Sequence, residues 1–372
     1  MASKRDARKR IAIITSALGA GGAEQVIAQL ASHWSGQGYC VEIVAFDRPD
    51  DPVFHDLPEH VVLHRLGVAG AMRRVMALRM VLARQRPELV ISFLTKINLI
   101  AALACLGTNI PLICSERNNP ERQGAHPLWN LALRAAYRRA GVIVCQTDAV
   151  RRCFDNSLRD RLVTIPNPVP ALERRPAANS RGRICAVGRL THQKGFDVLL
   201  QAFAMIAPRH PDWTLDVWGD GPERDRLAAR IEALDLQTRA HLRGLSTHPR
   251  SWMSGADIFV LSSRYEGFPN ALAEAMAAGL PVAATDCEFG PADMIESGRS
   301  GLLVPQEDSA ALAEAMDALI ADRELCERLG QGAHRAMERF RSERVLAMWD
   351  AVLASVTPPR IDCSHVPWPG LT

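Results

Sequence analysis

The chain has 372 residues, of which 48% are hydrophobic and 23% are charged. That length is sufficient for two hydrophobic cores, and the composition excludes a largely disordered protein. Aromatic residues make up only 5% of the chain, which favours helices packed on sheets over an all-β sandwich. The net charge of +3 is unevenly divided, with roughly +8 in residues 1–170 and roughly −5 in the remainder.

Nine cysteines are present, and no two of them form a CxxC pair. Their spacing, such as that between Cys105 and Cys114, matches no zinc site, so we expect reduced thiols in a cytoplasmic protein. The basic segment 1–10 leads into only a short apolar run, and the longest apolar stretch, near residues 97–106, is too short to span a bilayer. We therefore expect neither a signal peptide nor a membrane-spanning helix.

The first half of the chain alternates strand and helix patterns. A buried-strand pattern at 11–15 precedes a glycine-rich turn and an amphipathic helix over 23–35. Alternation of this kind predicts an α/β domain with a parallel, doubly wound sheet. Further strands are predicted at 41–46, 61–64, 89–92, 111–115 and 142–145, with helices over 71–86 and 128–140.

A proline-rich break at 165–170 and a polar run at 174–183 indicate a linker, after which the alternation resumes. We therefore predict two Rossmann-like domains, residues 1–172 and 173–341, and a loose tail at 358–372. The carboxyl ends of both sheets should line a cleft between the domains. In the second half, strands are predicted at 184–187, 214–218, 240–242, 257–261, 281–284 and 301–304, with helices over 196–207, 223–233, 271–278, 309–321, 323–340 and 342–355.

Two glutamates flank the start of the helix predicted after strand 257–261. Residues 266–274 read Glu-Gly-Phe-Pro-Asn-Ala-Leu-Ala-Glu, and proline is acceptable in a first helical turn. Free N–H groups at this helix start suit an anionic or hydroxyl-rich ligand, so Glu266 and Glu274 are candidates for a donor pocket. The alternative is that Glu266 caps the helix and Glu274 lies on a solvated face.

A second candidate motif directly follows the strand at 184–187. Residues 188–195 read Gly-Arg-Leu-Thr-His-Gln-Lys-Gly. A guanidinium and an ammonium on one strand-to-helix loop suit a diphosphate, which Arg189 would bind as a fork and Lys194 as a point charge. Two solvated cations on a polar loop are the alternative.

The glycine-rich turn at 19–24, Gly-Ala-Gly-Gly-Ala-Glu, occupies the position that cradles phosphates in dinucleotide-binding folds. It lacks the third glycine of GxGxxG, and only Asp47 stands near the place of a ribose-binding acid, which disfavours an NAD-type oxidoreductase. A non-enzymatic nucleotide- or nucleic-acid-binding module is disfavoured too, because the basic stretches lack interleaved aromatic residues.

In order and separation, these motifs and the segment 219–222, Gly-Asp-Gly-Pro, resemble family 4 retaining glycosyltransferases of the GT-B fold. The resemblance covers about residues 10–355 and is most specific at the 266–274 motif. It implies that the final helix, 342–357, packs back on the N-terminal domain. It also implies sugar transfer from a nucleotide-sugar donor, with no metal ion and no other cofactor. Glycogen- or sucrose-type transferases share this fold, but the chain is short for those enzymes.

The same resemblance implies a role for each motif residue. Arg189 and Lys194 would bind the donor diphosphate and stabilise the leaving nucleotide in place of a metal. Glu266 would hold hydroxyls of the donor sugar, and Glu274 would bind the ribose. Retention would follow from front-face attack, so Glu266 receives no covalent role. The other residues expected to contact substrate are Gly21, Gly22, Gly188, Gly244, Leu245, Gly267, Phe268, Pro269 and Asn270.

One departure from the family lies after the strand at 111–115. Many relatives carry a histidine there, whereas this chain has Glu116 and Arg117. We predict that Arg117 takes the place of that histidine and that Glu116 contacts substrate, with His126 a less favoured substitute. The alternative for Glu116 and Arg117 is a mutual ion pair on the surface.

The segments 92–96, 115–117 and 287–291 look most like those of enzymes that build bacterial surface polysaccharides and lipid-linked oligosaccharides, often from UDP-hexoses or UDP-N-acetylhexosamines. The acceptor would then be a glycan or a polyprenyl-diphosphate-linked sugar. The helix predicted over 71–86 contains no acidic residue, and basic amphipathic helices can lie on anionic lipid. Either its arginines are simply solvated, or the helix docks on the inner membrane through Arg73, Arg74, Arg79 and Arg84.

Overall fold

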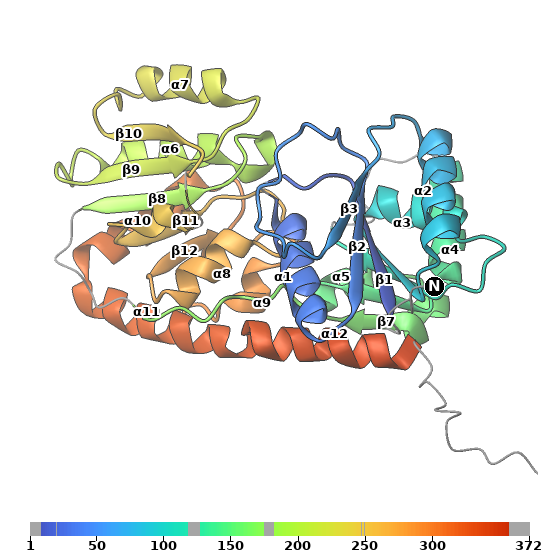
Figure 1. Ribbon diagram of the computed structural model, residues 1–372. Helices are drawn as coiled ribbons and strands as arrows, with labels where there is room; N and C mark the ends of the chain where they lie inside the picture. The colour runs from blue at the N-terminus through green and yellow to red at the C-terminus, as the bar shows by residue number, and fades with distance from the viewer. Residues whose placement is uncertain are drawn as a thin grey trace, which may run out of the picture.

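The computed structural model describes residues 9–19, 21–117, 127–174, 182–246, 248 and 250–356, with backbone alone for residues 127 and 128. Two parallel α/β units lie side by side, and a long helical stretch near the C-terminus runs along both of them (Figure 1). This is the α/β arrangement of two Rossmann-like domains that the alternating pattern predicts.

The N-terminal sheet has seven parallel strands in the order β3-β2-β1-β4-β5-β6-β7. Its inner strands are rich in branched apolar residues because helices cover both faces of the sheet. Ile13 and Ile14 of β1, for example, are fully buried. The strands are β1 (Arg10–Thr15), β2 (Cys40–Ala45), β3 (Val62–Arg65), β4 (Leu89–Phe93), β5 (Leu112–Glu116), β6 (Val142–Cys145) and β7 (Leu162–Thr164). The helices are α1 (Gly22–Gly36), α2 (Ala71–Gln85), α3 (Thr95–Ala104), α4 (Pro127–Arg139), α5 (Asp148–Arg152) and η2 (Asn156–Arg161).

The C-terminal sheet has six parallel strands in the order β10-β9-β8-β11-β12-β13. A second apolar core, which includes Phe203 and Leu312, lies between this sheet and its helices. The strands are β8 (Arg183–Val187), β9 (Thr214–Trp218), β10 (Ala240–Gly244), β11 (Ile258–Leu261), β12 (Val282–Thr285) and β13 (Leu302–Val304). The helices are η3 (His192–Lys194), α6 (Phe196–Ile206), α7 (Arg224–Ala233), η4 (Ser251–Met253), α8 (Asn270–Ala277), α9 (Pro291–Met294), α10 (Ser309–Ala321), α11 (Arg323–Ala336), η5 (Met337–Phe340) and α12 (Ser342–Val356).

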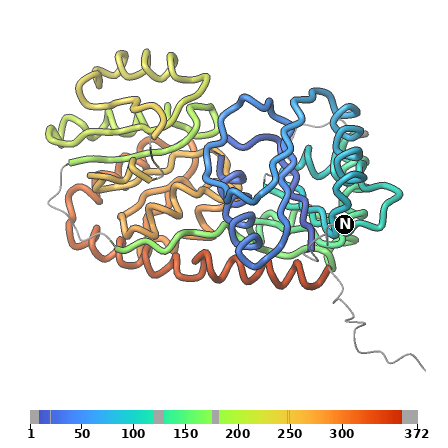
Figure 2. The backbone as a smooth tube through the Cα atoms, viewed as in Figure 1, coloured from blue at the N-terminus to red at the C-terminus, as the bar shows by residue number. Residues whose placement is uncertain are grey.

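The last helix, α12, leaves the C-terminal domain and packs on the N-terminal sheet (Figure 2). Trp349 is fully buried, and its ring stacks on Phe93 of β4 and meets Trp34 of α1 edge-on. The next residue, Asp350, accepts a 2.8 Å hydrogen bond from Nε1 of Trp34. This is the crossing helix that the GT-B resemblance implies.

Helix α3 and strand β7 are among the elements that were not predicted from the sequence pattern. Helix α3 is buried along most of its length, so its sequence is apolar on all sides and carries no amphipathic period. Strand β7 has only three residues and lies at the edge of its sheet. Within the described ranges, none of the helices combines the length and apolar character needed to cross a bilayer.

Helix α2 forms part of the outer side of the N-terminal domain (Figure 1). Arg73, Arg79 and Arg84 are exposed on it, as the sequence predicts. Arg74 is only partly exposed: its Nε donates to the carbonyl of Val68 at 3.0 Å, and its guanidinium lies 5.3 Å from the centre of the Phe46 ring. Arg74 therefore contributes to the packing of the domain, and its predicted part in a membrane-facing surface stays a prediction.

Candidate active site

The loops that follow the carboxyl ends of the two sheets meet and make direct contacts. Asn270, the first residue of α8, donates from Nδ2 to the carbonyl of Gly22 at 3.4 Å and to Oε1 of Gln25 at 3.1 Å. Asn167 donates to Oδ1 of Asn270 at 2.6 Å. The start of α8 is thereby held against the start of α1. We refer to this region, where the predicted motifs converge, as the interdomain junction.

Lys194 and Glu266, which were predicted from separate motifs, form an ion pair with 2.6 Å between Nζ and Oε1. Ser263 donates to the same carboxylate oxygen at 2.6 Å. Glu266 is only 7% exposed. The N-cap residue of α8 is Pro269, and the cap has no side-chain hydrogen bond. The alternative of a helix-capping Glu266 is therefore wrong, and the alternative of two solvated cations is wrong for Lys194 but agrees with the exposed Arg189.

The loop at 188–195 is fixed to the segment that follows β11. Ser262 donates from Oγ to the carbonyl of Lys194 at 2.9 Å, and the backbone N–H of Arg264 donates to Gln193 O at 2.8 Å. The side chain of Arg264 also donates to His192 O at 2.7 Å. Arg189, in the same loop after Gly188, is exposed. The loop thus has a fixed backbone and a guanidinium that is accessible to a ligand.

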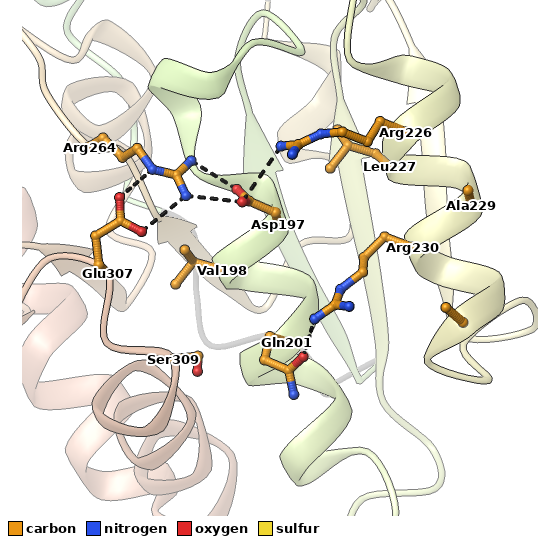
Figure 3. Close-up of a pocket in the computed structure, with 11 residues that line it drawn as sticks. Asp197, Val198, Gln201, Arg226, Leu227, Ala229, Arg230, Arg264, Glu307 and Ser309 are labelled. Carbon is orange, nitrogen blue, oxygen red and sulfur yellow. Dashed lines mark hydrogen bonds and ion pairs between the residues drawn. The ribbon is translucent and has the colours of Figure 1, made fainter.

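Arg264 also lines a pocket of about 500 Å³ between α6 and α7 (Figure 3). Its guanidinium donates to both carboxylate oxygens of Asp197, at 2.9 and 3.0 Å, and to Glu307. These hydrogen bonds raise the pKa of Arg264 further above its usual range. Because two carboxylates already neutralise this cation, we assign the pocket to support of the 188–195 loop and not to substrate binding.

Glu274 lies on α8 with its side chain only 12% exposed, so the alternative of a solvated glutamate is wrong. Its Oε1 accepts a 3.1 Å hydrogen bond from Nε2 of Gln25 and lies 3.7 Å from Nη1 of Arg250. Burial raises the pKa of Glu274, while the contacts with Gln25 and Arg250 oppose that shift.

Glu116 and Arg117 are both buried, which contradicts the alternative of a surface ion pair. Glu116, at the end of β5, is fully buried. It accepts hydrogen bonds from Oγ1 of Thr95 at 2.7 Å, from the backbone N–H of Arg117 at 2.9 Å and from the hydroxyl of Tyr137. This carboxylate therefore orders the end of β5, and its predicted contact with substrate stays a prediction.

Arg117 is only 6% exposed, and its guanidinium lies 4.8 Å from the centre of the Phe93 ring. Nη1 donates to Asn167, but Nε and Nη2 have no hydrogen-bond partner among the residues that the structure describes. Burial lowers the pKa of Arg117, and the charges of Glu116 and Glu24 oppose that shift. Because a guanidinium keeps its proton in proteins, Arg117 presents a buried cation with two unmet donors.

Gly267 is required where the two domains touch. A Cβ atom at this position would lie 2.6 Å from the carbonyl oxygen of Arg117 and 2.7 Å from Oε1 of Gln146, so no side chain fits without movement. Phe268, 7% exposed, packs edge-on against Phe340 just before the crossing helix. The 267–270 backbone is thereby held at the junction, between η5 and the N-terminal domain.

Other predicted residues lie further from the Lys194–Glu266 pair. Gly244 ends β10, two places from β8 in the sheet, and its carbonyl accepts a 2.8 Å hydrogen bond from the N–H of Gly219. The side chain of Leu245 is 61% exposed, so it is available to cover a base. His126 and the predicted tail 358–372 lie outside the described residues. Over the described part of the chain, no cluster of three His, Cys, Asp or Glu side chains is arranged to hold a metal ion.

Sequence reasoning missed several polar residues of the junction. Asn167 lies in the proline-rich break that was interpreted only as a linker, yet it contacts both Arg117 and Asn270. Gln25 directly follows the Gly-Gly-Ala-Glu segment, within the first turn of α1. Only its position beside that motif pointed to a role, because nothing in the sequence shows that α1 and α8 meet.

Two family models divide the chain between them. The model described as Glycosyltransferase Family 4 matches residues 20–171, and the model described as Glycosyl transferases group 1 matches residues 172–336. Their border falls in the segment that joins the two sheets, so each model corresponds to one domain.

Similar proteins include relatives and solved structures. The chain is 34% identical over 269 residues to an exopolysaccharide phosphotransferase of Streptomyces coelicolor. This match covers 71% of this chain but only 28% of that longer protein. It is 30% identical over 228 residues to the lipopolysaccharide core biosynthesis glycosyltransferase LpsE of Rhizobium meliloti, over 59% of this chain and 66% of LpsE. The Anabaena protein HepE in complex with UDP has a TM-score of 0.78 at 19% identity, over 93% of this chain and 100% of HepE. With both domains matched in order and this fold shared, the chain belongs to the family 4 glycosyltransferases of the GT-B fold.

Proposed function

We propose that this glycosyltransferase moves a hexose or N-acetylhexosamine from a UDP-sugar to a glycan or polyprenyl-diphosphate-linked acceptor in the assembly of bacterial surface polysaccharide. The observation that carries the proposal is the Lys194–Glu266 ion pair, which joins the two predicted donor motifs at 2.6 Å. The UDP in HepE supports the choice of nucleotide, and the names of the Streptomyces and Rhizobium relatives support the class of acceptor.

A sugar nucleotide would offer each residue of this pair a complementary group. The ammonium of Lys194 would turn to the diphosphate, where Arg189 would add a planar fork of donors. Glu266 would then accept hydrogen bonds from hydroxyls of the sugar, and the N–H groups at the start of α8 would face the phosphate. The two cations would stabilise the charge that develops on the leaving nucleotide, with no metal required.

We further propose that the reaction proceeds with retention and without a covalent enzyme intermediate. The Lys194 and Ser263 contacts engage Glu266 as an acceptor of hydrogen bonds, which favours a role in holding hydroxyls. The leaving phosphate would take the proton from the acceptor hydroxyl. Membership in the glycosyltransferases decides against the NAD-type oxidoreductase and the non-enzymatic binding module.

The test is hydrolysis of a panel of UDP-, GDP- and ADP-sugars in the presence of EDTA. We expect slow release of UDP from one donor by the wild type, and loss of that release in Glu266→Ala and in Arg189→Ala. Glu314→Ala, at an exposed position on α10, is the matched control and should behave as the wild type. The proposal fails if no donor turns over and no nucleotide shifts the melting temperature.

The acceptor side of the proposal rests on the exposed face of α2. Met72, Met76 and Met80 recur every four residues and are 70%, 61% and 69% exposed, so they form one apolar stripe along the helix. Helical geometry places Arg73 and Arg84 on one side of this stripe and Arg79 on the other, and all three are exposed. An apolar stripe between cations is the pattern of a helix that lies in a membrane interface.

Neighbouring residues extend this surface. Leu103 and Leu106, near the end of α3, are 40% and 49% exposed. A pocket of about 370 Å³ between α2 and α3 is lined by Arg79, Leu82 and Arg86, among others. We propose that this face docks on anionic lipid and so brings a lipid-linked acceptor to the junction.

Co-sedimentation with vesicles tests the docking face. We expect binding to phosphatidylglycerol vesicles and not to phosphatidylcholine vesicles at low salt. Removing three arginines (Arg73→Gln, Arg79→Gln and Arg84→Gln) should weaken that binding about 100-fold, because each cation contributes about 1 kcal/mol near the surface. A matched control removes three exposed arginines elsewhere, Arg152, Arg323 and Arg335. Equal losses in the two triple variants would contradict the docking face.

A further inference from the structure

The side chain of Glu24 folds back over the start of its own helix. A side chain at Gly21 would collide with Oε2 of Glu24, and the backbone N–H of Glu24 stabilises its own carboxylate. Helix α1 has 15 residues and begins directly after Gly21, which has no side chain with which to cap the free N–H groups. The carboxylate therefore lies where an external anion would meet the positive end of this helix.

Two arginines act on the same carboxylate from other parts of the fold. Arg117 follows β5 of the N-terminal domain, and Arg189 follows β8 of the C-terminal domain. The charges of both lower the pKa of Glu24, whereas its burial raises that pKa by more. Glu24 is thus a partly desolvated carboxylate whose charge is favoured by one cation from each domain.

Glu24 does not use the donors that these cations offer. Nε and Nη2 of Arg117, which is 6% exposed, still have no hydrogen-bond partner within the described residues. A phosphate group carries more acceptor oxygens than a carboxylate and pairs with a guanidinium through two parallel hydrogen bonds. A phosphate would therefore accept hydrogen bonds from both Arg117 and the N-terminus of α1, whereas Glu24 leaves the donors of Arg117 without a partner among the described residues.

We propose that the first turn of α1, Arg117 and Arg189 form an oxyanion subsite in which Glu24 is a built-in occupant that an arriving phosphate displaces. The inference rests on the proposed function, because the arriving phosphate belongs to the donor diphosphate or to the diphosphate of a lipid-linked acceptor. The displaced carboxylate returns when the product leaves. Glu24 therefore weakens phosphate binding and speeds release, and it keeps two neighbouring cations compensated while the subsite is empty.

Isothermal titration calorimetry at low ionic strength tests this inference. The probes are UDP for the donor, farnesyl diphosphate for the acceptor and inorganic diphosphate for the shared chemistry. Glu24→Gln keeps the shape of the side chain and removes its charge, so we expect inorganic diphosphate to bind about 3- to 10-fold more tightly. Glu59→Gln, an exposed acid in the same domain, should bind all three probes as the wild type does. In an Arg189→Ala background the gain from Glu24→Gln should shrink.

The three probes separate the outcomes. A tighter complex with UDP assigns the subsite to the donor, and one with farnesyl diphosphate alone assigns it to the acceptor. A gain for inorganic diphosphate with no binding of UDP would leave the subsite standing and overturn the proposed transfer from a UDP-sugar instead. Unchanged or weaker binding of all probes by both Glu24→Gln and Glu24→Ala, with melting temperatures like that of the wild type, would overturn the inference.

Discussion

Gln25 on the first helix of the N-terminal domain donates a 3.1 Å hydrogen bond to Glu274 of the C-terminal domain, 249 positions later in the chain. The carboxylate that the family resemblance assigns to the nucleotide ribose is thus engaged across the junction. A ribose hydroxyl that approaches Glu274 would compete with Gln25 for the same oxygen. If Glu274 binds the ribose as proposed, binding of the nucleotide and contact between the domains would be linked through this carboxylate.

Replacing Gln25 by alanine should loosen the junction. A hydrogen bond to a charged group contributes about 1.5–3 kcal/mol, so without it the open arrangement of the domains gains population. We expect a larger radius of gyration for Gln25→Ala by small-angle X-ray scattering. Gln201→Ala is the control, because among the described residues the side chain of Gln201 bonds only to Arg230 of its own domain. Equal radii for Gln25→Ala and the control would argue against the linkage.

Glu274 should make the stability of the free enzyme depend on pH. Burial raises its pKa above the ordinary value, so folding favours the protonated form. The stabilisation is complete below the ordinary pKa of 4.5 and is lost as the pH rises through the higher folded pKa. Glu274→Gln should therefore unfold at a higher temperature than the wild type at pH 7. Melting curves recorded from pH 4.5 to 7.5 test this prediction. A constant difference between the melting temperatures of the wild type and the variant over that range would contradict it.

Lys194→Met should abolish most transfer activity while the fold remains. The substitution removes one cation from the leaving group, and loss of one such stabilising group costs about 10²- to 10³-fold in kcat. It also leaves Glu266, which is 7% exposed, with Ser263 as a remaining partner. Lys96→Met, at an exposed position on α3, is the control. If Lys194→Met retained wild-type kcat with the preferred donor, Lys194 would have no role in the chemical step.

The two-domain fold and the separate motifs could be predicted because each depends on local pattern. The buried run of β1 and the glycines that follow it lie together in the sequence, as do Gly188 and Lys194. The contacts that make the site could not be predicted in this way. That Gly267 touches the backbone of Arg117, or that Asn167 joins Arg117 to Asn270, depends on the placement of one domain against the other.

The spacing of the motifs did not show which of their charged residues are buried and which are exposed. An adjacent Glu-Arg pair after a strand has the same sequence whether it lies at the surface or beneath a helix. Tyr137 and Thr95 cover Glu116 from α4 and from the start of α3, and α3 was missed because its sequence has no amphipathic period. Similarly, Arg74 and Arg73 are neighbours on α2, and the contacts with Val68 and Phe46 distinguish the partly buried Arg74 from the exposed Arg73.

Arg264 should act as a positioning residue for the 188–195 loop. It donates to His192 O and is neutralised by Asp197 and Glu307, outside the junction. Arg264→Met would leave those carboxylates unpaired and release the loop that carries Arg189. We expect about a 10-fold rise in the KM for donor, a smaller change in kcat and partial recovery in Arg264→Lys, because a misplaced binding group costs affinity first. Arg299→Met, at a position 77% exposed, is the control.

An equal fall in kcat and kcat/KM for Arg264→Met, with KM unchanged, would contradict this assignment, because it would place Arg264 in the transition state itself. A lower melting temperature alone would not distinguish the two roles. The comparison of KM with kcat does distinguish the two roles. Arg264 lines a pocket between α6 and α7, outside the junction, so a positioning role predicts a change mainly in KM.

Trp349 should be the residue by which α12 joins the domains. Its side chain is fully buried and contacts Phe93 and Trp34, with ring centroids 6.0 and 6.3 Å away. Trp349→Ala would leave a cavity between α12 and the N-terminal sheet, which costs about 3–5 kcal/mol. Urea unfolding should show that loss, whereas Met348→Ala, at a neighbouring position 39% exposed, should change the free energy of unfolding little. If Trp349→Ala were as stable as Met348→Ala, the helix would be held by its polar contacts, such as that of Asp350 with Trp34, and not by the buried ring.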